Sequence, residues 1–451
     1  MSNPAEDKDA PAHALEADVV VIGGGPAGTT AATLLARRGW KVILLEKARH
    51  PRFHIGESLL PMNLPILERL GVLDQVRAIG VHKLGADFPL QDEADTTHVF
   101  RFDRAIDPKY GYAFQVKREE FDQLLFRHAL ANGVDAREDT KVERVDFEGG
   151  RPRVVHARGA DGVALAVRTR YLVDASGRDT FLGGKLKLKR KSDAHQSAAI
   201  FSHFTGVQRR DGADAGNITI DRFAHGWYWL IPLKDDVMSI GAVCFPEYLK
   251  QRRGDSEQFL MQTLAMTPSV WKRMGDAKRV APVHVTGNYS YSCSTMSGPG
   301  WVMAGDAYAF IDPVFSSGVY LAMNSAEHAA GVVDGSLREP AREQRLQRAM
   351  ARRLQRGLRH FSWFIHRFTS PVMQRLFADP RNVLQIEQAV ISMLAGDVFD
   401  NRPVLRRLRL FRMLYAANAL VIAPEALRGW RARRRQVAES FGGDTLQDGN
   451  P

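Results

Sequence analysis

A glycine-rich turn near the start of the chain has the spacing that holds a pyrophosphate. The run Gly23-Gly24-Gly25-Pro26-Ala27-Gly28 matches G-x-G-x-x-G. In that pattern the first glycine permits a tight turn, the second lets the backbone approach the phosphates, and the third lets a helix pack closely on a strand. Glu46 follows 23 residues after Gly23, where a carboxylate accepts hydrogen bonds from an adenosine ribose. These residues predict a dinucleotide site at a helix N-terminus.

The segments around this turn have the pattern of a β-α-β unit. Residues 17–22 (ADVVVI) form a short apolar run that is typical of a buried parallel strand. Residues 27–38 predict a helix that ends at Gly39, and residues 41–45 (KVILL) predict the next strand. Because a helix joins the two strands, we expect them to lie in a parallel sheet.

Further along, the pattern changes to a second sheet and then to helices. Residues 153–157, 164–173 and 238–244 are rich in β-forming residues and predict strands, some of them antiparallel. Residues 319–333 and the chain from 343 onward predict helices. One apolar helix face, with arginines on the other side, is marked by Val404, Leu408, Phe411 and Tyr415.

The composition favours a large globular protein without disulfides or zinc. The chain has 451 residues and 45% apolar content, which is enough for two or three domains. Cys244 and Cys293 are the two cysteines and have no metal-ligand spacing, so we expect no metal site and a cytoplasmic location. The first 16 residues lack the apolar core of a signal peptide. Residues 413–424 are shorter than the roughly 20 residues of a membrane span.

Two later motifs separate FAD from other dinucleotides. Asp174-Ala175-Ser176-Gly177 follows a predicted strand, and Gly305-Asp306 follows another at residues 301–304. Together with the glycine-rich turn, and in this order, they resemble the motifs of the FAD-dependent aromatic hydroxylase superfamily. The resemblance implies that Asp306 contacts the ribityl chain of FAD. It also implies that Arg118, in QVKREEFDQLL, lies near the flavin.

Three further segments resemble the flavin-dependent halogenases of that superfamily. Trp227-Tyr228-Trp229-Leu230-Ile231-Pro232 matches W-x-W-x-I-P, and residues 310–318 (FIDPVFSSG) match F-x-x-P-x-x-S-x-G. Residues 54–61 (HIGESLLP) are similar to the G-E-S segment of this family, and Lys83 lies about where its catalytic lysine stands. The likeness covers residues 17–400 and is strongest to the branch that acts on phenols, pyrroles and carrier-linked substrates.

The resemblance implies a reaction. Reduced FAD and O2 would form a flavin C4a-hydroperoxide, and a chloride or bromide ion would attack it to give hypohalous acid. The Lys83 ammonium would then hold the hypohalous acid, or form a chloramine, beside an electron-rich aromatic substrate of secondary metabolism. The resemblance also implies that FADH2 comes from a separate flavin reductase, and the sequence, which shows no second dinucleotide motif, fits this.

The resemblance also implies site residues. The halide would bind at Ser317 and Gly318, where a helix start supplies N–H donors. The residues implied to bind FAD are Gly23, Gly25, Pro26, Ala27, Gly28, Glu46, Lys47, Glu57, Ser58, Arg118, Asp174, Gly177, Asp306, Pro313 and Gly318. The signature residues implied to separate the flavin from the substrate are Trp227, Trp229, Ile231, Pro232, Phe310 and Ser316.

One position departs from the halogenases that act on free tryptophan. In that branch a glutamate precedes the S-x-G turn, whereas this chain has Phe315. A phenol or pyrrole loses its proton more easily than an indole, so the change favours such a substrate over free tryptophan. Three alternatives stay open: an aromatic monooxygenase, a polyprenyl (geranylgeranyl) reductase, and a non-catalytic FAD-bound scaffold.

The net charge of +11 is concentrated at the C-terminus, where residues 401–451 hold ten arginines and four acids. No nucleic-acid-binding motif accompanies this charge. We expect it to dock an acidic acyl carrier protein that bears the substrate, through Arg428, Arg431 and residues 433–435. Peripheral contact with a membrane surface is the alternative.

The sequence thus predicts an α/β fold with three parts. They are a Rossmann-type FAD-binding domain like those of glutathione reductase and the aromatic hydroxylases, an inserted and mostly antiparallel β-sheet substrate domain, and a helical C-terminal extension. The predicted bounds are a disordered tail at 1–16, the FAD-binding domain at 17–85, 115–190 and 295–330, the substrate domain at 86–114 and 191–294, and the helices at 331–451.

Overall fold

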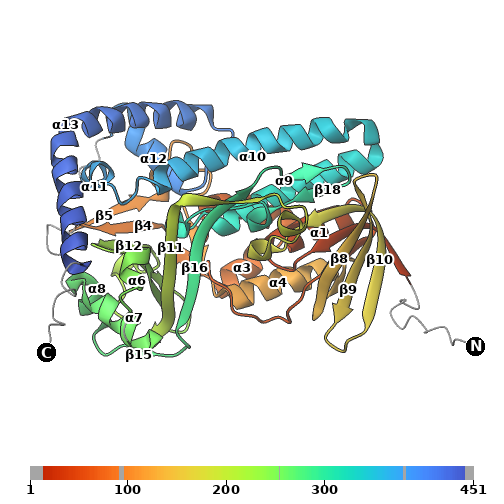
Figure 1. The fold of residues 1–451 in the computed structure, drawn as a ribbon, viewed down its shortest axis with the longest axis horizontal. Coiled ribbons are helices and arrows are strands. Elements are labelled where there is room, and N and C mark those ends of the chain that lie inside the picture. The colour runs from red at the N-terminus through yellow and green to blue at the C-terminus, as the bar shows by residue number, and fades with distance from the viewer. Residues whose placement is uncertain (1–13, 91–95, 253, 379–381, 442–451) are drawn as a thin grey trace, which may run out of the picture.

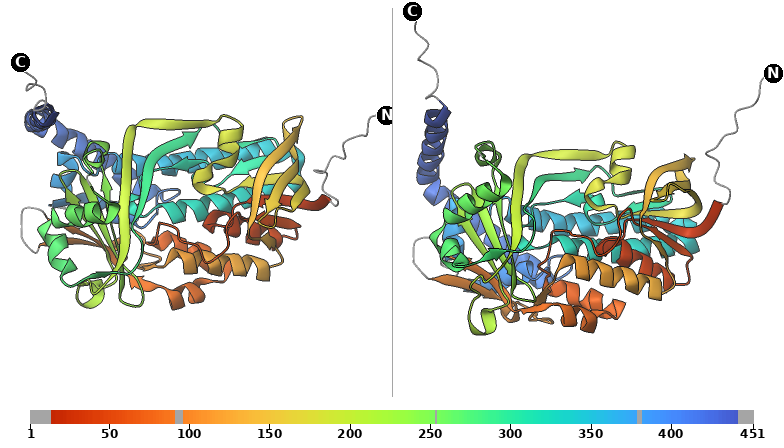
Figure 2. Two further views of the ribbon diagram at one scale, coloured as in Figure 1. Left: turned by 60° about the horizontal axis from the view of Figure 1, so that its bottom comes forward. Right: turned by 90° about the horizontal axis from the view of Figure 1, so that it is seen from below.

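The structure is a computed structural model that describes residues 14–90, 96–252, 254–378 and 382–441. Figure 1 shows an elongated molecule with one large sheet toward each end. Figure 2 shows that the first strand and the last helix lie at opposite ends of the molecule. Residues 1–13 of the predicted tail lie outside the described residues. The division into domains stays a prediction.

The first large sheet has eight strands and a parallel centre. Its strand order is β17-β18-β10-β1-β2-β7, and β9 and β8 extend it antiparallel from β10. The central strand β1 pairs in parallel with both β2 and β10. The strands are β1 (Ala14–Ile22), β2 (Val42–Leu45), β7 (Asp135–Arg137), β8 (Thr140–Glu148), β9 (Arg151–Gly159), β10 (Ala164–Asp174), β17 (Ser297–Gly298) and β18 (Trp301–Met303).

The predicted β-α-β unit is confirmed, with small shifts at its ends. β1 begins at Ala14, three residues before the predicted start, because its N-terminal part also pairs with β10. Helix α1 (Pro26–Ala36) ends before Gly39, which has a φ of 86°. α1 packs against α4 (Arg118–Ala131) and α9 (Gly318–Arg338), so residues far apart in the sequence meet beside the glycine-rich turn.

The second large sheet has nine strands and is mostly antiparallel, as predicted. Its order is β19-β16-β11-β14-β13-β12-β4-β5, and β15 pairs with β11. Only the β12–β4 pair is parallel among the pairs described in this sheet. The strands are β4 (Gly85–Pro89), β5 (Thr97–Arg101), β11 (Lys189–Thr205), β12 (Ile218–Phe223), β13 (Gly226–Pro232), β14 (Val237–Cys244), β15 (Lys278–Arg279), β16 (His284–Cys293) and β19 (Ala309–Phe310).

A separate pair of short antiparallel strands joins the two ends of the molecule. These are β3 (Val81–Lys83) and β6 (Ala113–Gln115), with Lys83 opposite Ala113. The remaining α-helices before residue 300 are α2 (Leu64–Leu70), α3 (Leu73–Ile79), α5 (Phe181–Lys185), α6 (Pro246–Leu249), α7 (Ser256–Ala265) and α8 (Pro268–Met274).

The C-terminal part is helical, as predicted. Its α-helices after α9 are α10 (Glu343–Ile365), α11 (Pro371–Ala378), α12 (Ile386–Leu394) and α13 (Arg402–Phe441), and α10 packs along α9 (Figure 1). Val404, Leu408 and Phe411 are buried, which confirms the predicted apolar face of α13. The side chains of residues 422–441, including Arg428 and Arg431, lie outside the described ones. No described helix combines the length and the apolar character needed to cross a bilayer.

Both cysteines are buried and free. Cys244 ends β14, and Cys293 ends β16 beneath Gly183, where an added Cβ would approach the Cys293 sulfur to 2.8 Å. Burial raises the pKa of the Cys244 thiol to about 12 and also raises that of Cys293. The two residues therefore pack as small apolar side chains.

The close approach within the glycine-rich turn gives a test of the fold. A Cβ on Gly28 would lie 1.8 Å from the Gly23 carbonyl oxygen, with no flexible side chain to yield. We expect Gly28→Ala to lower the free energy of unfolding by at least about 1–3 kcal/mol and to abolish FAD binding. Urea unfolding and the absorbance of bound flavin measure the two effects. The control is Gly331→Ala in α9, where an added Cβ meets nothing within 4 Å; equal loss in both variants would contradict the prediction.

Candidate active site

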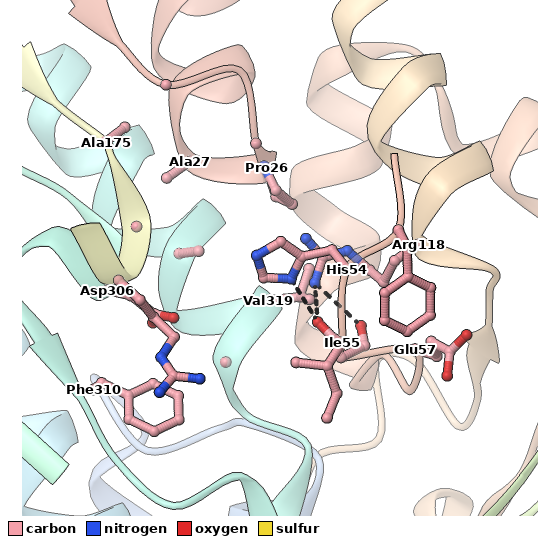
Figure 3. Close-up of a pocket in the computed structure, with 18 of the residues that line it drawn as sticks. Pro26, Ala27, His54, Ile55, Glu57, Arg118, Ala175, Asp306, Phe310 and Val319 are labelled. Atoms are coloured by element: carbon pink, nitrogen blue, oxygen red, sulfur yellow. Dashed lines mark hydrogen bonds between the residues drawn. The ribbon is translucent and has the colours of Figure 1, made fainter. Parts of the chain in front are cut away.

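A cavity lies where the two large sheets approach each other. Its wall includes Gly23 and Ala175, just after strands β1 and β10, and Trp227 and Trp229 of β13 in the second sheet. Figure 3 shows Asp306 and Phe310 on one side of this cavity and Arg118 and Glu57 on the other. The carboxyl ends of parallel strands are where open α/β sheets bind ligands.

The glycine-rich turn and Glu46 form one end of the cavity as a single hydrogen-bonded unit. The Gly24 N–H donates to the Glu46 carboxylate at 2.6 Å, and the Ala48 N–H donates to its other oxygen at 2.9 Å. Gly25 caps α1 without a side-chain hydrogen bond, so no side chain occupies the N–H groups at the helix start. The Lys47 ammonium pairs with Asp179 beside this turn. This end can hold a pyrophosphate and an adenosine ribose.

Arg118 is fixed by a buried ion pair at the first turn of α4. Its guanidinium donates twice to Asp122, at 2.9 Å each, and once to the Ile55 carbonyl at 2.7 Å (Figure 3). Burial opposes the charge on Asp122, but Arg118 outweighs burial and lowers the pKa of this carboxyl. Arg52 lies 3.4 Å from Asp122 and 3.6 Å from Glu46. Arg118 is therefore held rigidly in the cavity wall.

The two aspartates expected to contact FAD have different positions. Asp306 lies in the cavity wall, where burial raises the pKa of its carboxyl to about 6 despite Arg178 and Arg118. Asp174 is not among the residues that line the cavity. Its two oxygens accept hydrogen bonds from the N–H groups of Ser176 (3.0 Å) and Leu182 (2.7 Å). Asp174 thus holds the loop that carries Ala175, Ser176 and Gly177 into the wall.

The turn before α9 has the features of an anion site. Ser316 has a left-handed backbone with a φ of 55°, Ser317 caps α9, and Gly318 is its first residue. The Ser317 hydroxyl oxygen is buried without a hydrogen-bond partner among the described residues. Ser316 and Gly318 line the cavity. Since the helix start supplies N–H groups and a positive dipole end, this turn can hold a halide.

Phe315 fills the position before this turn with an apolar ring. It is 3% exposed, and its ring meets that of Phe368 edge-on at 5.4 Å between centroids. Phe368 in turn contacts the ring of Phe88 in β4 at 5.9 Å. The side of the turn that faces the C-terminal helices is therefore aromatic and has no carboxylate at residue 315.

Lys83 is buried beside the cavity rather than exposed to solvent. The side chain is 1% exposed, and its ammonium donates to the Ser58 hydroxyl at 2.9 Å and to the Leu59 carbonyl at 3.0 Å. The Phe102 ring centroid is 5.2 Å away. Burial lowers the pKa of Lys83 to about 7, although Asp87 raises it. Within the described part of the chain no carboxylate forms an ion pair with this amine.

Ser58 connects Lys83 to the flavin side of the structure. Ser58 lines the cavity, whereas Lys83 is not among its lining residues. Ser58 also pairs with Gln115 by an isolated bridge, next to the β3–β6 pair that carries Lys83. The neighbouring Glu57 lies in the wall and bonds to the ring of His203 at 2.9 Å. The G-E-S segment therefore separates the amine from the cavity by a single side chain.

The two signature tryptophans lie on one face of β13. Trp227 and Trp229 are 5% and 4% exposed and their rings are 5.9 Å apart. The Trp229 indole N–H donates to Ser239 at 3.1 Å, and its ring lies against Gly241, where an added Cβ would approach within 2.3 Å. Trp227, Trp229 and Ile231 line the cavity, but Pro232 does not.

The structure also brings in residues that the motifs did not indicate. Arg52, Phe53, His54 and Arg178 line the same cavity. The Arg178 guanidinium lies 4.9 Å from the Phe310 ring centroid and donates to Thr286 at 2.8 Å. The position of Arg178 directly after the D-A-S-G motif could have indicated that this residue lies in the site. Arg52 and Phe53 immediately precede the segment at residues 54–61, which begins with His54, but nothing in the spacing of these three residues marks them.

Comparisons with known proteins show which family this chain belongs to. The FAD binding domain family matches residues 16–363. A tryptophan 2-halogenase from Chondromyces crocatus is 38% identical over 70% of this chain, which spans only 60% of that protein. The flavin-dependent halogenase gsfI from Penicillium aethiopicum is 33% identical over 86% of this chain and 76% of its own. A 1H-pyrrole-2-carbonyl-[peptidyl-carrier protein] chlorinase from Pseudomonas fluorescens is 28% identical over 85% of this chain and 90% of its own.

A solved structure extends the agreement to three dimensions. The myxobacterial chondrochloren halogenase CndH superposes with a TM-score of 0.74 and 32% identity over 90% of this chain and 97% of its own. The fold is that of an FAD-dependent enzyme. The chain belongs to the flavin-dependent halogenase family, which confirms the resemblance and the fold class predicted from the sequence.

The lowered pKa of Lys83 gives a prediction about stability. Between pH 7 and the ordinary lysine pKa of 10.5, the unfolded chain binds a proton at this residue that the folded chain lacks. The free energy of unfolding should therefore gain up to about 1.4 kcal/mol per pH unit from this group as the pH rises through that window. In Lys83→Met we expect this increase of the free energy of unfolding with pH to be absent. Urea unfolding at pH 7 and pH 9 measures it, with Lys141→Met on exposed β8 as the control; equal slopes in wild type and Lys83→Met would contradict the prediction.

Proposed function

We propose that this protein is an FADH2-dependent halogenase of an electron-rich aromatic, a phenol or a pyrrole. The proposal rests on the position of the Lys83 amine, which is buried behind Ser58 at the edge of the cavity. An amine without a carboxylate partner is costly to bury. Such a group suits the reaction with hypohalous acid that the family resemblance implies.

The residues present fit FAD. The cradle formed by Gly24, Gly25 and Glu46 would hold the pyrophosphate and the ribose, and Asp306 would contact the ribityl chain. Arg118 and Glu57 would lie near the flavin ring. The remaining residues proposed to support the cofactor are Gly23, Pro26, Ala27, Gly28, Lys47, Ser58, Gly177, Pro313 and Gly318, with Asp174 acting through its loop. When bound, reduced FAD supplies with O2 the oxidant that converts a halide to hypohalous acid.

The chain's own residues would then guide the oxidant. The N–H groups at Ser317 and Gly318 and the unpaired Ser317 hydroxyl would hold the halide. Trp227 and Trp229 would keep the organic substrate away from the flavin, which disfavours direct hydroxylation. The Ser58 hydroxyl would pass the hypohalous acid to Lys83. A pKa of about 7 leaves both forms of the amine populated at neutral pH, so a hydrogen-bonded oxidant and a chloramine are both open to it.

The surroundings of Phe315 support a phenol or a pyrrole as substrate. Phe315 and Phe368 offer aromatic contacts and no base that could take a proton from the substrate. The likeness to a chlorinase of a carrier-bound pyrrole supports a carrier-tethered substrate. The likeness to a tryptophan 2-halogenase favours a second candidate, an indole. Because Phe315 replaces the glutamate of the free-tryptophan branch, we rank the indole second.

An assay with supplied reduced flavin tests the function. Enzyme, a flavin reductase, FAD, NADH, O2 and bromide are incubated with a phenol, a pyrrole thioester or tryptophan. We expect the bromine isotope pair in the mass spectrum of the phenol or pyrrole product, and little turnover of tryptophan. NADH without the reductase should give no product. A hydroxylated product without bromine would instead identify a monooxygenase. In a parallel incubation with a polyprenyl substrate, reduction of its double bonds would identify a reductase.

Substitutions at Lys83 and Ser58 test the proposed pathway of the oxidant. We expect Lys83→Ala and Lys83→Met to lower the halogenation rate at least about 100-fold, the scale of losing one positioned acid or base group. Bound FAD and release of hydrogen peroxide should be retained in both variants. Ser58→Ala should lower product formed per peroxide released without abolishing it. The control is Lys141→Ala on exposed β8. Full turnover of a folded, FAD-loaded Lys83→Met would refute the role of the amine.

A further inference from the structure

A second recess lies between α10 and α13, away from the flavin cavity. It has a volume of about 750 Å³. Its lining, which we call the arginine groove, consists of Arg356, Arg359, His360, Arg402, Leu405, Arg406, Arg409 and Arg412. The ring of Phe364 stacks on that of Phe411 at 5.2 Å and joins the two helices beneath the groove. In Figure 1, α10 runs along the top of the molecule, and α13 lies at the top left and extends down the left side.

Among the described residues, no side chain neutralises the positive charge in this groove. No acidic side chain is among its described lining residues. Five of its arginines, all except Arg412, form no hydrogen bond or ion pair within the described part of the chain. The sequence agrees, since no acid occurs between Glu343 and Asp379 or between Asn401 and Glu425. An ordinary surface helix intersperses acids with its arginines, so this groove is unusual.

Contacts with Trp363 and His360 fix Arg412 within the groove. Its guanidinium lies 5.0 Å from the Trp363 ring centroid and donates to the Nδ1 atom of His360 at 3.0 Å. The Arg412 Nε atom is buried and has no hydrogen-bond partner among the described residues. Burial and then the charges of Arg412 and Arg409 lower the pKa of His360 to about 4. His360 therefore accepts the hydrogen bond as a neutral ring, and the neighbouring arginine charges repel one another.

We infer that the arginine groove binds a phosphate group. Guanidinium groups match phosphate oxygens with paired N–H donors, and several arginines from two helices can contact several oxygens at once. A halide offers no set of oxygens for such forks. The phosphate could belong to the pantetheine arm of a carrier protein or to a lipid headgroup. Phosphate binding here is independent of halogenation, so the two proposals can fail separately.

Calorimetric titration of the FAD-loaded enzyme with inorganic pyrophosphate tests this inference. FAD fills the dinucleotide site, so pyrophosphate cannot bind there. We expect one saturable site whose affinity falls as salt rises, accompanied by a change in the tryptophan fluorescence that Trp363→Phe removes. Halogenation of a free phenol should be unchanged in the groove variants below.

Two double variants with the same change of charge make the test specific. Arg356→Ala/Arg409→Ala removes one groove arginine from each helix. Arg345→Ala/Arg352→Ala removes two arginines of α10 that lie outside the groove. We expect at least tenfold weaker pyrophosphate binding in the first variant and less than twofold change in the second. Equal loss in both, or no saturable binding in the wild type, would overturn the inference.

Competition identifies the source of the phosphate. 4′-Phosphopantetheine represents the arm of a carrier protein, and vesicles of phosphatidylglycerol carry the lipid phosphate. If 4′-phosphopantetheine displaces pyrophosphate from the groove, the arm of a carrier is the ligand. If the vesicles bind the enzyme and lose it in Arg356→Ala/Arg409→Ala, the ligand is a headgroup. Either result supports a phosphate site. Failure of both probes together with pyrophosphate would refute it.

Discussion

Burial of one amine constrains the whole arrangement around the flavin cavity. Lys83 is 1% exposed, and among the described residues its ammonium donates only to a hydroxyl and a carbonyl. A buried charge without a counter-ion is unstable, which is why burial lowers the pKa of this amine to about 7. Strands β3 and β6 hold the backbone of Lys83 against the G-E-S segment. The amine is thus kept buried next to Ser58, a residue of the cavity wall.

The cavity beside this amine is assembled from distant parts of the chain. The glycine-rich turn comes from residues 23–28, the tryptophans from β13, and the anion turn from the start of α9. The packing of α1 against α4 and α9 brings the first and last of these segments together. Arg118, fixed by Asp122, stiffens the opposite wall. Contacts within the protein itself therefore position the residues of these walls.

The sequence predicted the parts of this site that depend on local spacing. The glycine turn, Glu46, the tryptophan pair and the serine turn could be recognised because each motif lies in one loop or on one strand face, whereas the packing of distant elements brings them together. The position of Asp174 outside the cavity wall was not predicted, because its oxygens accept from the Ser176 and Leu182 N–H groups, a choice of partners that spacing does not reveal. Arg52 and the burial of Lys83 depend on contacts between segments far apart in the chain. The arginine groove requires two helices to meet, so composition indicated the charge but not its location.

The two cysteines have a further consequence in an enzyme that handles a strong oxidant. Thiolates are among the side chains most readily oxidised, and susceptibility follows ionisation and exposure. Both thiols here are buried, protonated and absent from the cavity wall. Oxidant that escapes Lys83 would instead meet the indoles of Trp227 and Trp229. Oxidative damage during turnover without an organic substrate should therefore accumulate as oxidised tryptophan rather than as sulfenic acid or intermolecular disulfides.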